Sequence, residues 1–193
     1  MNESRINTIK SRAYNVDPTR NASRVFQALM ETYPQFGYWT GSHDPILHHY
    51  GRHGLNIHTC EVIELGLSCI DNLHIQHLVD RVEYFYAALF HDTGKIFDYV
   101  MNESEEWHPT AHRRLIHHLP RSVLIWHDTI KLFPELNEKY HDSVMHAILA
   151  HHGSREAGSP VAPKSRVAWM LHLCDGISAR MNDADTLDVV KRK

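Results

Sequence analysis

The stretch AALFHDTGKI, residues 87–96, decides how this sequence is interpreted. The chain from Val82 to His91 is strongly apolar and predicts a helix, which the glycine of DTGK ends. His91 shares its helix face with Ala87 and Ala88, so its imidazole points toward the core. A His–Asp pair at the end of an apolar helix needs partners, because burying unpaired polar groups is costly.

Outward from this helix, the sequence predicts more helices and no convincing strand. Residues 34–54 are predicted to form an irregular loop and residues 96–110 an acidic connector. On either side of these two segments, apolar residues recur at helical spacing. Further helices are expected over residues 21–33, 55–70, 111–133 with a bend at Pro120, 140–152 and 165–181. We therefore expect an all-α fold of about six or seven helices. It divides into an N-terminal arm, helix and loop (1–47), a helical domain (48–182) and a tail (183–193).

The composition is that of an ordinary globular protein. The 193 residues suit one domain, and 42% hydrophobic with 22% charged residues argues against disorder. A formal net charge of −3 argues against a large basic surface for long nucleic acid. The N-terminus lacks the apolar core of a secretory signal, and no apolar run is long enough to span a bilayer. We expect a soluble, cytoplasmic protein without a membrane partner.

The three cysteines favour the same compartment. Cys60, Cys69 and Cys174 form no CxxC pair, and each lies inside an apolar run. We therefore expect free, buried thiols in a reducing environment.

Histidine is the unusual residue type, with 18 among 193 residues. Several histidines and aspartates fall on or near apolar faces of the predicted helices. Taken singly, each is better explained as a satisfied core or surface residue, and HHG at 151–153 as a helix end with imidazoles near its dipole. Taken together, the ordered set is better explained by a metal than by separate hydrogen bonds. The set is His58, His91, Asp92, His118, His151 and Asp175.

The order His … His-Asp … His … His … Asp on an all-α scaffold resembles the HD-domain metal phosphohydrolases. It is most similar to the HD domain of 3′-5′ exoribonucleases of the YhaM type. The last matching stretch, with HHG, GSP and LHxxD in register, is the most specific. The matching stretches are HHYGRHGLNIHT (48–59), AALFHDTGKI (87–96), RRLIHHLPRSV (113–123) and ILAHHGSREAGSPVAPKSRVAWMLHLCDGISARM (148–181).

The resemblance implies a metal site made by the same six residues. His58 matches the first metal histidine and Asp175 the closing ligand, while Asp92 would bridge two metals or orient the attacking water. His117 and His152 are alternatives to their neighbours His118 and His151. Four histidines and two aspartates suffice for two divalent ions, and imidazole with carboxylate suits Mn²⁺, Fe²⁺, Co²⁺, Ni²⁺ or Mg²⁺ better than a closed structural Zn²⁺ site.

Other residues are candidates for contacts with a substrate. Lys95, one turn beyond the His–Asp pair, would have a catalytic role by contacting phosphate, or is a solvated surface lysine. Three cations flank the GSP loop: Arg155, Lys164 and Arg166. Three further histidines could assist the leaving group: His48, His49 and His112. Three aromatic residues either stack on a base or belong to the core: Trp39, Tyr50 and Trp107.

The chain departs from the exoribonuclease pattern in three ways. It has no strand-rich nucleic-acid-binding segment, it reads His53-Gly54 where the family has two glycines, and it is mildly acidic. We therefore expect a phosphodiesterase that uses a metal-activated water on a nucleotide, a cyclic nucleotide or a short oligonucleotide.

Three other functions are open on the same scaffold. They are an HD nucleotidase with one metal, a di-iron oxygenase, and a non-catalytic nucleotide-binding module. His118 and His151 favour two metals over one, and the match from HHG to GSP favours phosphohydrolysis over oxygenation. The complete ligand set favours an enzyme over a binding module. The sequence does not determine the oligomeric state.

Overall fold

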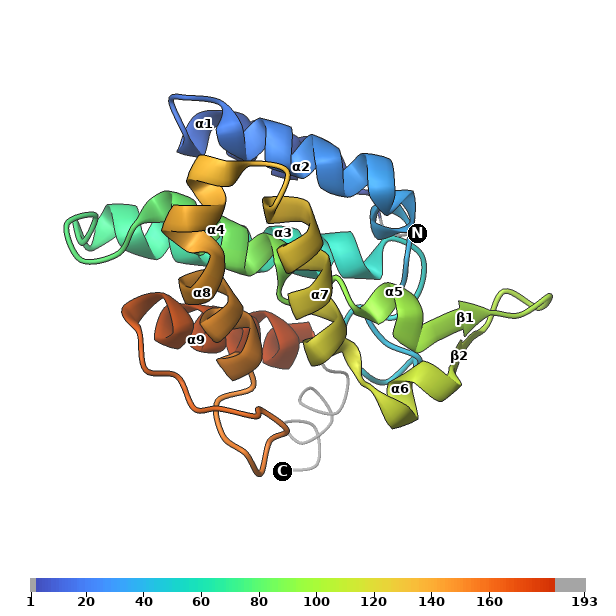
Figure 1. The fold of residues 1–193 in the computed structure, drawn as a ribbon. Helices are drawn as coiled ribbons and strands as arrows, with labels where there is room; N and C mark the ends of the chain where they lie inside the picture. The colour runs from blue at the N-terminus through green and yellow to red at the C-terminus, as the bar shows by residue number, and fades with distance from the viewer. Residues whose placement is uncertain (1–2, 183–193) are drawn as a thin grey trace.

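A computed structural model describes residues 3–182, and its regular structure is almost entirely helical (Figure 1). Seven of the helices have ten or more residues, which confirms the all-α prediction. The elements are α1 (Ile6–Val16), α2 (Asn21–Thr32), the 3-10 helix η1 (Pro34–Gly37), α3 (Gly54–Asn72), α4 (Arg81–Phe90), α5 (Lys95–Asp98), β1 (Tyr99–Met101), β2 (Trp107–Pro109), α6 (Ala111–Leu115), α7 (His118–Ile130), α8 (Pro134–Ala150) and α9 (Arg166–Asn182).

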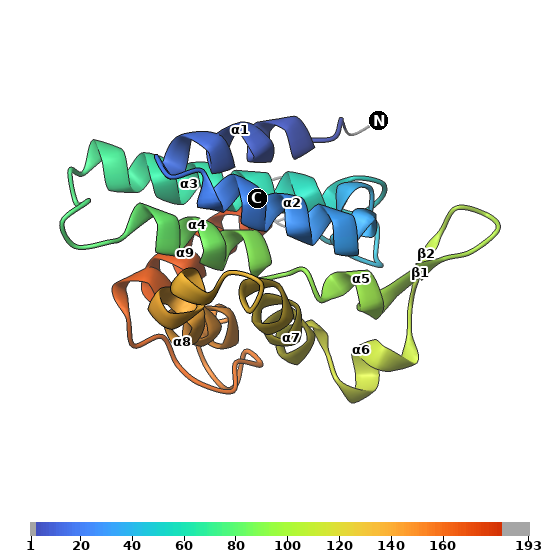
Figure 2. The ribbon, with the colours of Figure 1, turned by 45° about the horizontal axis from the view of Figure 1, so that its top comes forward.

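α4 is the central helix of the bundle. Residues 84–90 are fully buried, and α4 packs against α3, α7, α8 and α9 (Figure 2). The carboxylate of Asp80 caps its N-terminus by accepting hydrogen bonds from the backbone N–H groups of Val82 and Glu83. A helix covered on all sides needs no polar face, which explains the apolar sequence YFYAALF. Its C-terminal end, and His91 after it, therefore lie in the interior.

A close helix contact sets the position of α3 against α4. A Cβ atom at Gly66 of α3 would lie 1.9 Å from the ring of Tyr84. The Tyr84 hydroxyl donates a hydrogen bond of 2.6 Å to the backbone oxygen of Val62. Only glycine leaves room for this approach, which sets α3 and its His58 beside α4.

α1 and α2 lie along the α3–α4 side of the molecule (Figure 2). Ile9 and Ala13 of α1, with Val25 and Leu29 of α2, are fully buried in the same core as α3 and α4. The polar segment 1–20, for which the sequence leaves an arm or a short entry helix open, thus contains a packed helix. Within residues 3–182, no helix combines the length and apolar character needed to cross a bilayer.

A small antiparallel hairpin occupies the segment expected to be an acidic connector. Tyr99 of β1 pairs with Pro109 of β2, and Met101 pairs with Trp107. Each strand has three residues, which is too short for alternation to stand out in the sequence. The prediction of no strand is wrong here, although the fold class holds.

The helix expected over 111–133 is in fact two helices. α6 ends at Leu115, and His117 before α7 has a positive φ of 73° with an extended ψ of 160°, which breaks the helix. Pro120 does not bend a helix, because it lies in the first turn of α7, where its missing N–H has no partner to lose. For the same reason Pro134 begins α8 ahead of its expected start at Tyr140.

Two residues expected inside the molecule face outward. Cys69 is exposed, whereas Cys60 and Cys174 are buried free thiols. Ile177 of α9, which the helical spacing places inward with Val167, Leu171 and Cys174, is half exposed. The other three are buried as expected, so the predicted stripe departs from the buried face only toward the end of the helix.

Candidate metal centre

The six predicted ligands come from five helices and meet at one place. His58 lies on α3, His91 and Asp92 directly follow α4, and Asp175 lies on α9. His118 begins α7, and His151 directly follows α8. Because helix ends and the buried face of α3 converge here, residues more than a hundred positions apart become neighbours.

Asp92 lies between two groups of imidazoles and is only 2% exposed. Its Oδ2 atom lies 3.4 Å from Nε2 of His58 and 3.5 Å from Nε2 of His91. Its Oδ1 atom lies 3.3 Å from Nε2 of His118 and 3.7 Å from Nε2 of His151. The two carboxylate oxygens thus face different histidines.

Asp175 joins the first of these groups. Its Oδ1 atom lies 3.0 Å from Nε2 of His58 and 3.8 Å from Nε2 of His91. The Nε2 atoms of the two histidines are themselves 3.2 Å apart. We call this set the first group: His58, His91, Asp92 and Asp175.

The second group contains both histidines of the AHHG sequence. Candidate ligand atoms of His118, His151 and His152 lie within 4.8 Å of one another. Nε2 of His118 is 3.3 Å from Nε2 of His152. We call this set, together with the shared Asp92, the second group: Asp92, His118, His151 and His152. His152 therefore lies beside His151 in the group and does not replace it. His117, the alternative to His118, lies beside it with ring centroids 4.1 Å apart.

Hydrogen bonds orient the imidazoles with Nε2 toward the centre. Nδ1 of His91 donates to the backbone oxygen of Ala88, and Nδ1 of His151 donates to that of Ile148, both at 2.7 Å. A neutral imidazole that donates through Nδ1 presents a lone pair at Nε2. Second contacts of this kind are typical of metal-binding histidines.

His58 is oriented by a side-chain relay. Its Nδ1 lies 3.0 Å from the hydroxyl of Ser178, which donates a hydrogen bond of 2.7 Å to the carboxylate of Glu61. Because the hydroxyl proton is used on Glu61, the hydroxyl oxygen accepts from Nδ1–H of His58. Burial lowers the pKa of His58, but its contacts with Asp175 and Asp92 outweigh burial and raise the pKa to about 9. An ion at Nε2 of His58 would therefore take the place of a proton there.

The chemistry of this donor set fits divalent cations. Oδ1 of Asp92 is buried and has no hydrogen-bond partner among the described residues. A buried carboxylate oxygen without a partner is costly unless a cation satisfies it. Burial lowers the pKa of His118 to about 4 and that of His151 well below its ordinary value. Both are therefore neutral at pH 7, the form that binds metals.

Lys95 is buried and paired, so it is not a solvated surface lysine. Its Nζ lies 2.6 Å from Oδ2 of Asp92, and the residue is 7% exposed. Burial raises the pKa of Asp92, but the charges of Lys95 and His91 outweigh it and hold the pKa well below its usual range. Burial lowers the pKa of Lys95, and Asp92 more than restores it. Both groups are charged at neutral pH.

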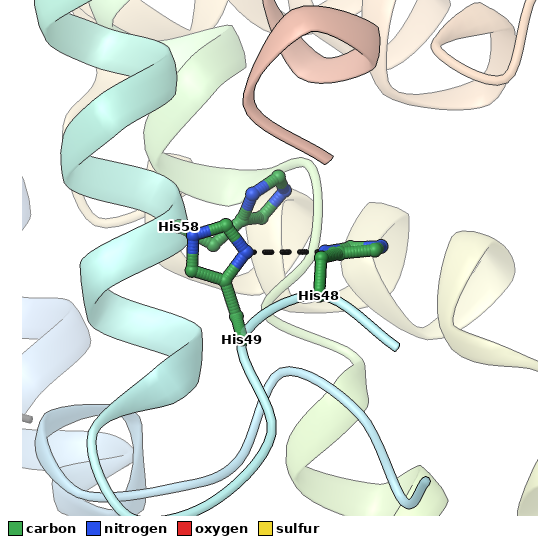
Figure 3. A group of neighbouring side chains, drawn as sticks. All are labelled: His48, His49 and His58. Atoms are coloured by element: carbon green, nitrogen blue, oxygen red, sulfur yellow. Dashed lines mark hydrogen bonds between the residues drawn. The ribbon is translucent and has the colours of Figure 1, made fainter. Parts of the chain in front are cut away.

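His48 and His49 extend the first group toward the loop before α3. Figure 3 shows both imidazoles beside His58. Nδ1 of His48 lies 3.1 Å from Nδ1 of His49, and Nε2 of His49 lies 3.0 Å from Oε2 of Glu61. These two helper candidates therefore lie next to the proposed ligands. His112 instead contacts Asp98, at 2.8 Å.

The cations of the GSP loop lie apart from this cluster. Arg155, Lys164 and Arg166 are exposed. Arg155 and Lys164 line a pocket that also includes His146 and Val161. Among residues 3–182, no hydrogen bond or ion pair joins their side chains to either group of ligands.

The aromatic candidates are divided between core and surface. Trp107 is 4% exposed, and its ring lies 4.8 Å from that of Trp39, which packs against the core. Tyr50 is half-buried. At least the two tryptophans are therefore packing residues.

Two carboxylates near the site were missed by reasoning from the sequence. Glu61 supports His58 through Ser178, and Asp98 is fully buried beside His112 and His118. Asp98 falls in the segment expected to be an acidic connector. Nothing in one sequence distinguishes a buried aspartate there from an exposed one.

Comparison with known proteins agrees with this geometry. The model of the HD domain family matches residues 56–180. The chain is 29% identical over 176 residues to the 3′-5′ exoribonuclease YhaM of Geobacillus sp. (strain WCH70), covering 89% of this chain and 51% of that protein. It is also 29% identical to the enzymes of the same name from Listeria innocua (167 residues) and Bacillus pumilus (168 residues), in each case over 86% of this chain and 50% of the relative.

The chain thus spans about half the length of the curated relatives it matches. No solved structure gives a significant match. The segment that matches the family contains both groups of clustered histidines and aspartates. The protein belongs to the HD domain family.

Proposed function

We propose that this protein is a metal-dependent phosphohydrolase that cleaves a phosphoester in a nucleotide, a cyclic nucleotide or a short oligonucleotide. Family membership and the named activity of the relatives support hydrolysis of a nucleic-acid type of phosphoester. A formal net charge of −3 favours a small substrate over long RNA, because long strands are held mainly by basic surfaces.

The observation that carries the proposal is the position of Asp92 between two sets of imidazole nitrogens. One oxygen faces His58 and His91, and the other faces His118 and His151. This arrangement supports two divalent ions that share the Asp92 carboxylate. The first ion would also take Asp175, and the second would also take His152.

Bound ions would supply Lewis acidity and would lower the pKa of water into the neutral range. The chain's own residues would do the rest. The imidazoles would fix the positions of the ions, and Asp92 is ionised beside Lys95. The ammonium group of Lys95 is near enough to the centre to bind a phosphate oxygen and share its charge during cleavage.

The donor types favour particular ions. Both groups consist of imidazoles and carboxylates, and neither includes a thiolate. Such a set suits Mn²⁺, Fe²⁺, Co²⁺, Ni²⁺ or Mg²⁺ better than a closed structural Zn²⁺ site.

The test is hydrolysis of bis(p-nitrophenyl) phosphate by protein that has been freed of metal and then loaded with Mn²⁺. A panel of cyclic nucleotides, dinucleotides, short RNA and DNA, and nucleoside triphosphates would then identify the substrate. We expect turnover that is abolished by His91→Ala and by Asp92→Ala, with helical content unchanged. His77→Ala and Asp128→Ala change exposed residues of the same types and should leave activity intact.

Four outcomes would count against the proposal or its parts. No turnover with any divalent metal, from a folded protein, would contradict it. One ion per chain at saturation would indicate the nucleotidase with a single metal. Oxygen uptake with bound iron would indicate an oxygenase. Tight nucleotide binding without product would indicate a binding module.

A further inference from the structure

A fully buried carboxylate lies behind the second group, on the side away from Asp92. We infer that Asp98 is a positioning residue that holds His118 in the tautomer and orientation needed to bind the second metal ion. The ion itself rests on the proposed function, whereas the orientation of His118 does not. Neither the ligand set nor the mechanism above uses Asp98.

Asp98 is the last residue of α5 and is 0% exposed. Its Oδ1 lies 2.8 Å from Nδ1 of His112, and its Oδ2 lies 3.4 Å from Nδ1 of His118. The opposite nitrogen of His118, Nε2, faces Asp92 and His152. His118 therefore stands between a supporting carboxylate and the centre.

The hydrogen bond from Arg121 determines which nitrogen of His112 carries the proton. Nε of Arg121 donates a hydrogen bond of 3.1 Å to Nε2 of His112. Because a guanidinium cannot accept, Nε2 of His112 carries no proton and Nδ1 does. That proton goes to Oδ1 of Asp98.

Asp98 then determines the state of His118. When Nε2 of His118 holds an ion, the single proton of the neutral imidazole lies on Nδ1, and Oδ2 of Asp98 is the acceptor that faces it. Asp98 thereby opposes the other tautomer, in which Nε2 would donate to Oδ1 of Asp92, 3.3 Å away. Nε2 of His118 is left with a lone pair toward the centre.

Asp98 and His118 are close to hydrogen-bonding distance but do not form a hydrogen bond in this structure. Oδ2 of Asp98 and Nδ1 of His118 are both buried, and neither makes a fully formed hydrogen bond within the described residues. They lie 3.4 Å apart, so a small rotation of the imidazole would complete the bond. Carboxylate–histidine–metal arrangements of this kind raise the basicity of the ligand.

Different residues orient the histidines of the two groups, so the loss of one supporting residue should affect only one ion. His58 is oriented by Ser178 and Glu61, and His91 by the backbone oxygen of Ala88. Loss of Asp98 should therefore weaken the second ion and leave the first in place.

Asp98→Asn is the most informative substitution, because it keeps the shape of the side chain and replaces one acceptor oxygen by an N–H₂ donor. The amide oxygen must still accept from His112, so the amide N–H₂ faces Nδ1 of His118. His118 would then carry its proton on Nε2 and lose its free lone pair. We expect Mn²⁺ titration calorimetry and metal analysis to show a second ion bound about 10- to 100-fold more weakly, with the first ion unchanged.

Asp17→Asn is the matched control, since Asp17 is also a buried aspartate that accepts hydrogen bonds, but it lies before α2. Asp17→Asn should bind both ions like the unchanged protein. Equal second-ion affinity in Asp98→Asn and the unchanged protein would overturn the inference and leave the proposed function standing.

Imidazole ¹⁵N shifts of the metal-free protein at pH 7, unchanged and as a folded Asp98→Asn variant, test the inference without any ion. Oδ1 of Asp92 lies 3.3 Å from Nε2 of His118 and competes for the proton, so we expect a larger Nδ1-protonated fraction of His118 in the unchanged protein than in the variant. An equal fraction in the two proteins would overturn the inference. Should the unchanged protein bind only one ion, the dinuclear proposal fails, while the tautomer still decides the role of Asp98.

Discussion

Three buried aspartates show how this chain keeps charge inside a small protein. Asp17, Asp92 and Asp98 are 6%, 2% and 0% exposed. Asp92 has the ammonium of Lys95, and Asp98 has the imidazole of His112. Asp17 forms no ion pair within residues 3–182 and instead accepts hydrogen bonds from Thr19 and from the backbone N–H of Ala22. Each carboxylate is therefore stabilised by donors of a different kind.

Asp17 allows a pH prediction that does not involve the metal centre. Burial raises its pKa, but the hydrogen bonds from Thr19 and Ala22 outweigh it, so the folded pKa lies below the ordinary value of 3.8. Stability from a lowered carboxyl pKa is fully present above the unfolded pKa and is lost as the pH falls through the folded pKa. We expect Asp17→Asn to lower the free energy of unfolding by about 1 kcal/mol at pH 7.

Urea denaturation of both proteins between pH 7 and pH 3 would check this prediction. The difference between them should stay constant down to about pH 4 and then shrink, because the unchanged protein loses its advantage when Asp17 is protonated. A difference that grows on acidification would contradict the assigned direction of the pKa shift.

At the scale of elements, the turn between α4 and α5 connects the two groups of ligands. Gly94 in this turn lies against the start of α7, and its N–H donates a hydrogen bond of 2.9 Å to the hydroxyl of Ser122. A Cβ atom at Gly94 would lie 2.2 Å from the backbone oxygen of His118. The close approach therefore sets the distance between Asp92 and the histidine that begins α7.

Gly94→Ala should push α7 away from the turn. We expect a loss of about 1–3 kcal/mol in the free energy of unfolding, as for overpacked sites, and weaker binding of the second ion. Gly176→Ala is the control, because Gly176 lies inside α9 with open space around it. There alanine should raise stability by up to about 1 kcal/mol. Equal effects of the two substitutions, by thermal unfolding and Mn²⁺ titration, would contradict this account.

The long helices could be predicted from the sequence, but their breaks could not. α4 and α9 carry enough apolar residues at helical spacing to be recognised, and the observed bounds lie close to those expected. The break between α6 and α7 depends on the positive φ of His117, which is uncommon for any residue other than glycine and which the sequence does not mark. Pro120 was placed inside one long helix, whereas it actually lies in the first turn of another.

At the scale of the whole molecule, the meeting of the ligands depends on packing that no single segment encodes. The ordered histidines and aspartates, together with the family resemblance, were enough to predict which residues would come together. The register left His151 and His152 as alternatives, and only the position of α8 against α7 shows that both lie near His118. Asp98 and Glu61 were not predicted, because their roles depend on contacts between separate elements.

A centre drawn from five helices should couple metal binding to the stability of the whole fold. Ions that bind only the folded state stabilise it by about 2.7 kcal/mol at a concentration 100 times their Kd. We therefore expect the midpoint of thermal unfolding to rise with Mn²⁺ and to fall again when EDTA is added. Asp92→Ala removes the residue shared by both groups and should abolish the rise, whereas Asp128→Ala should retain it. A midpoint that does not respond to Mn²⁺ in the unchanged protein would mean that the imidazoles and carboxylates meet without holding an ion.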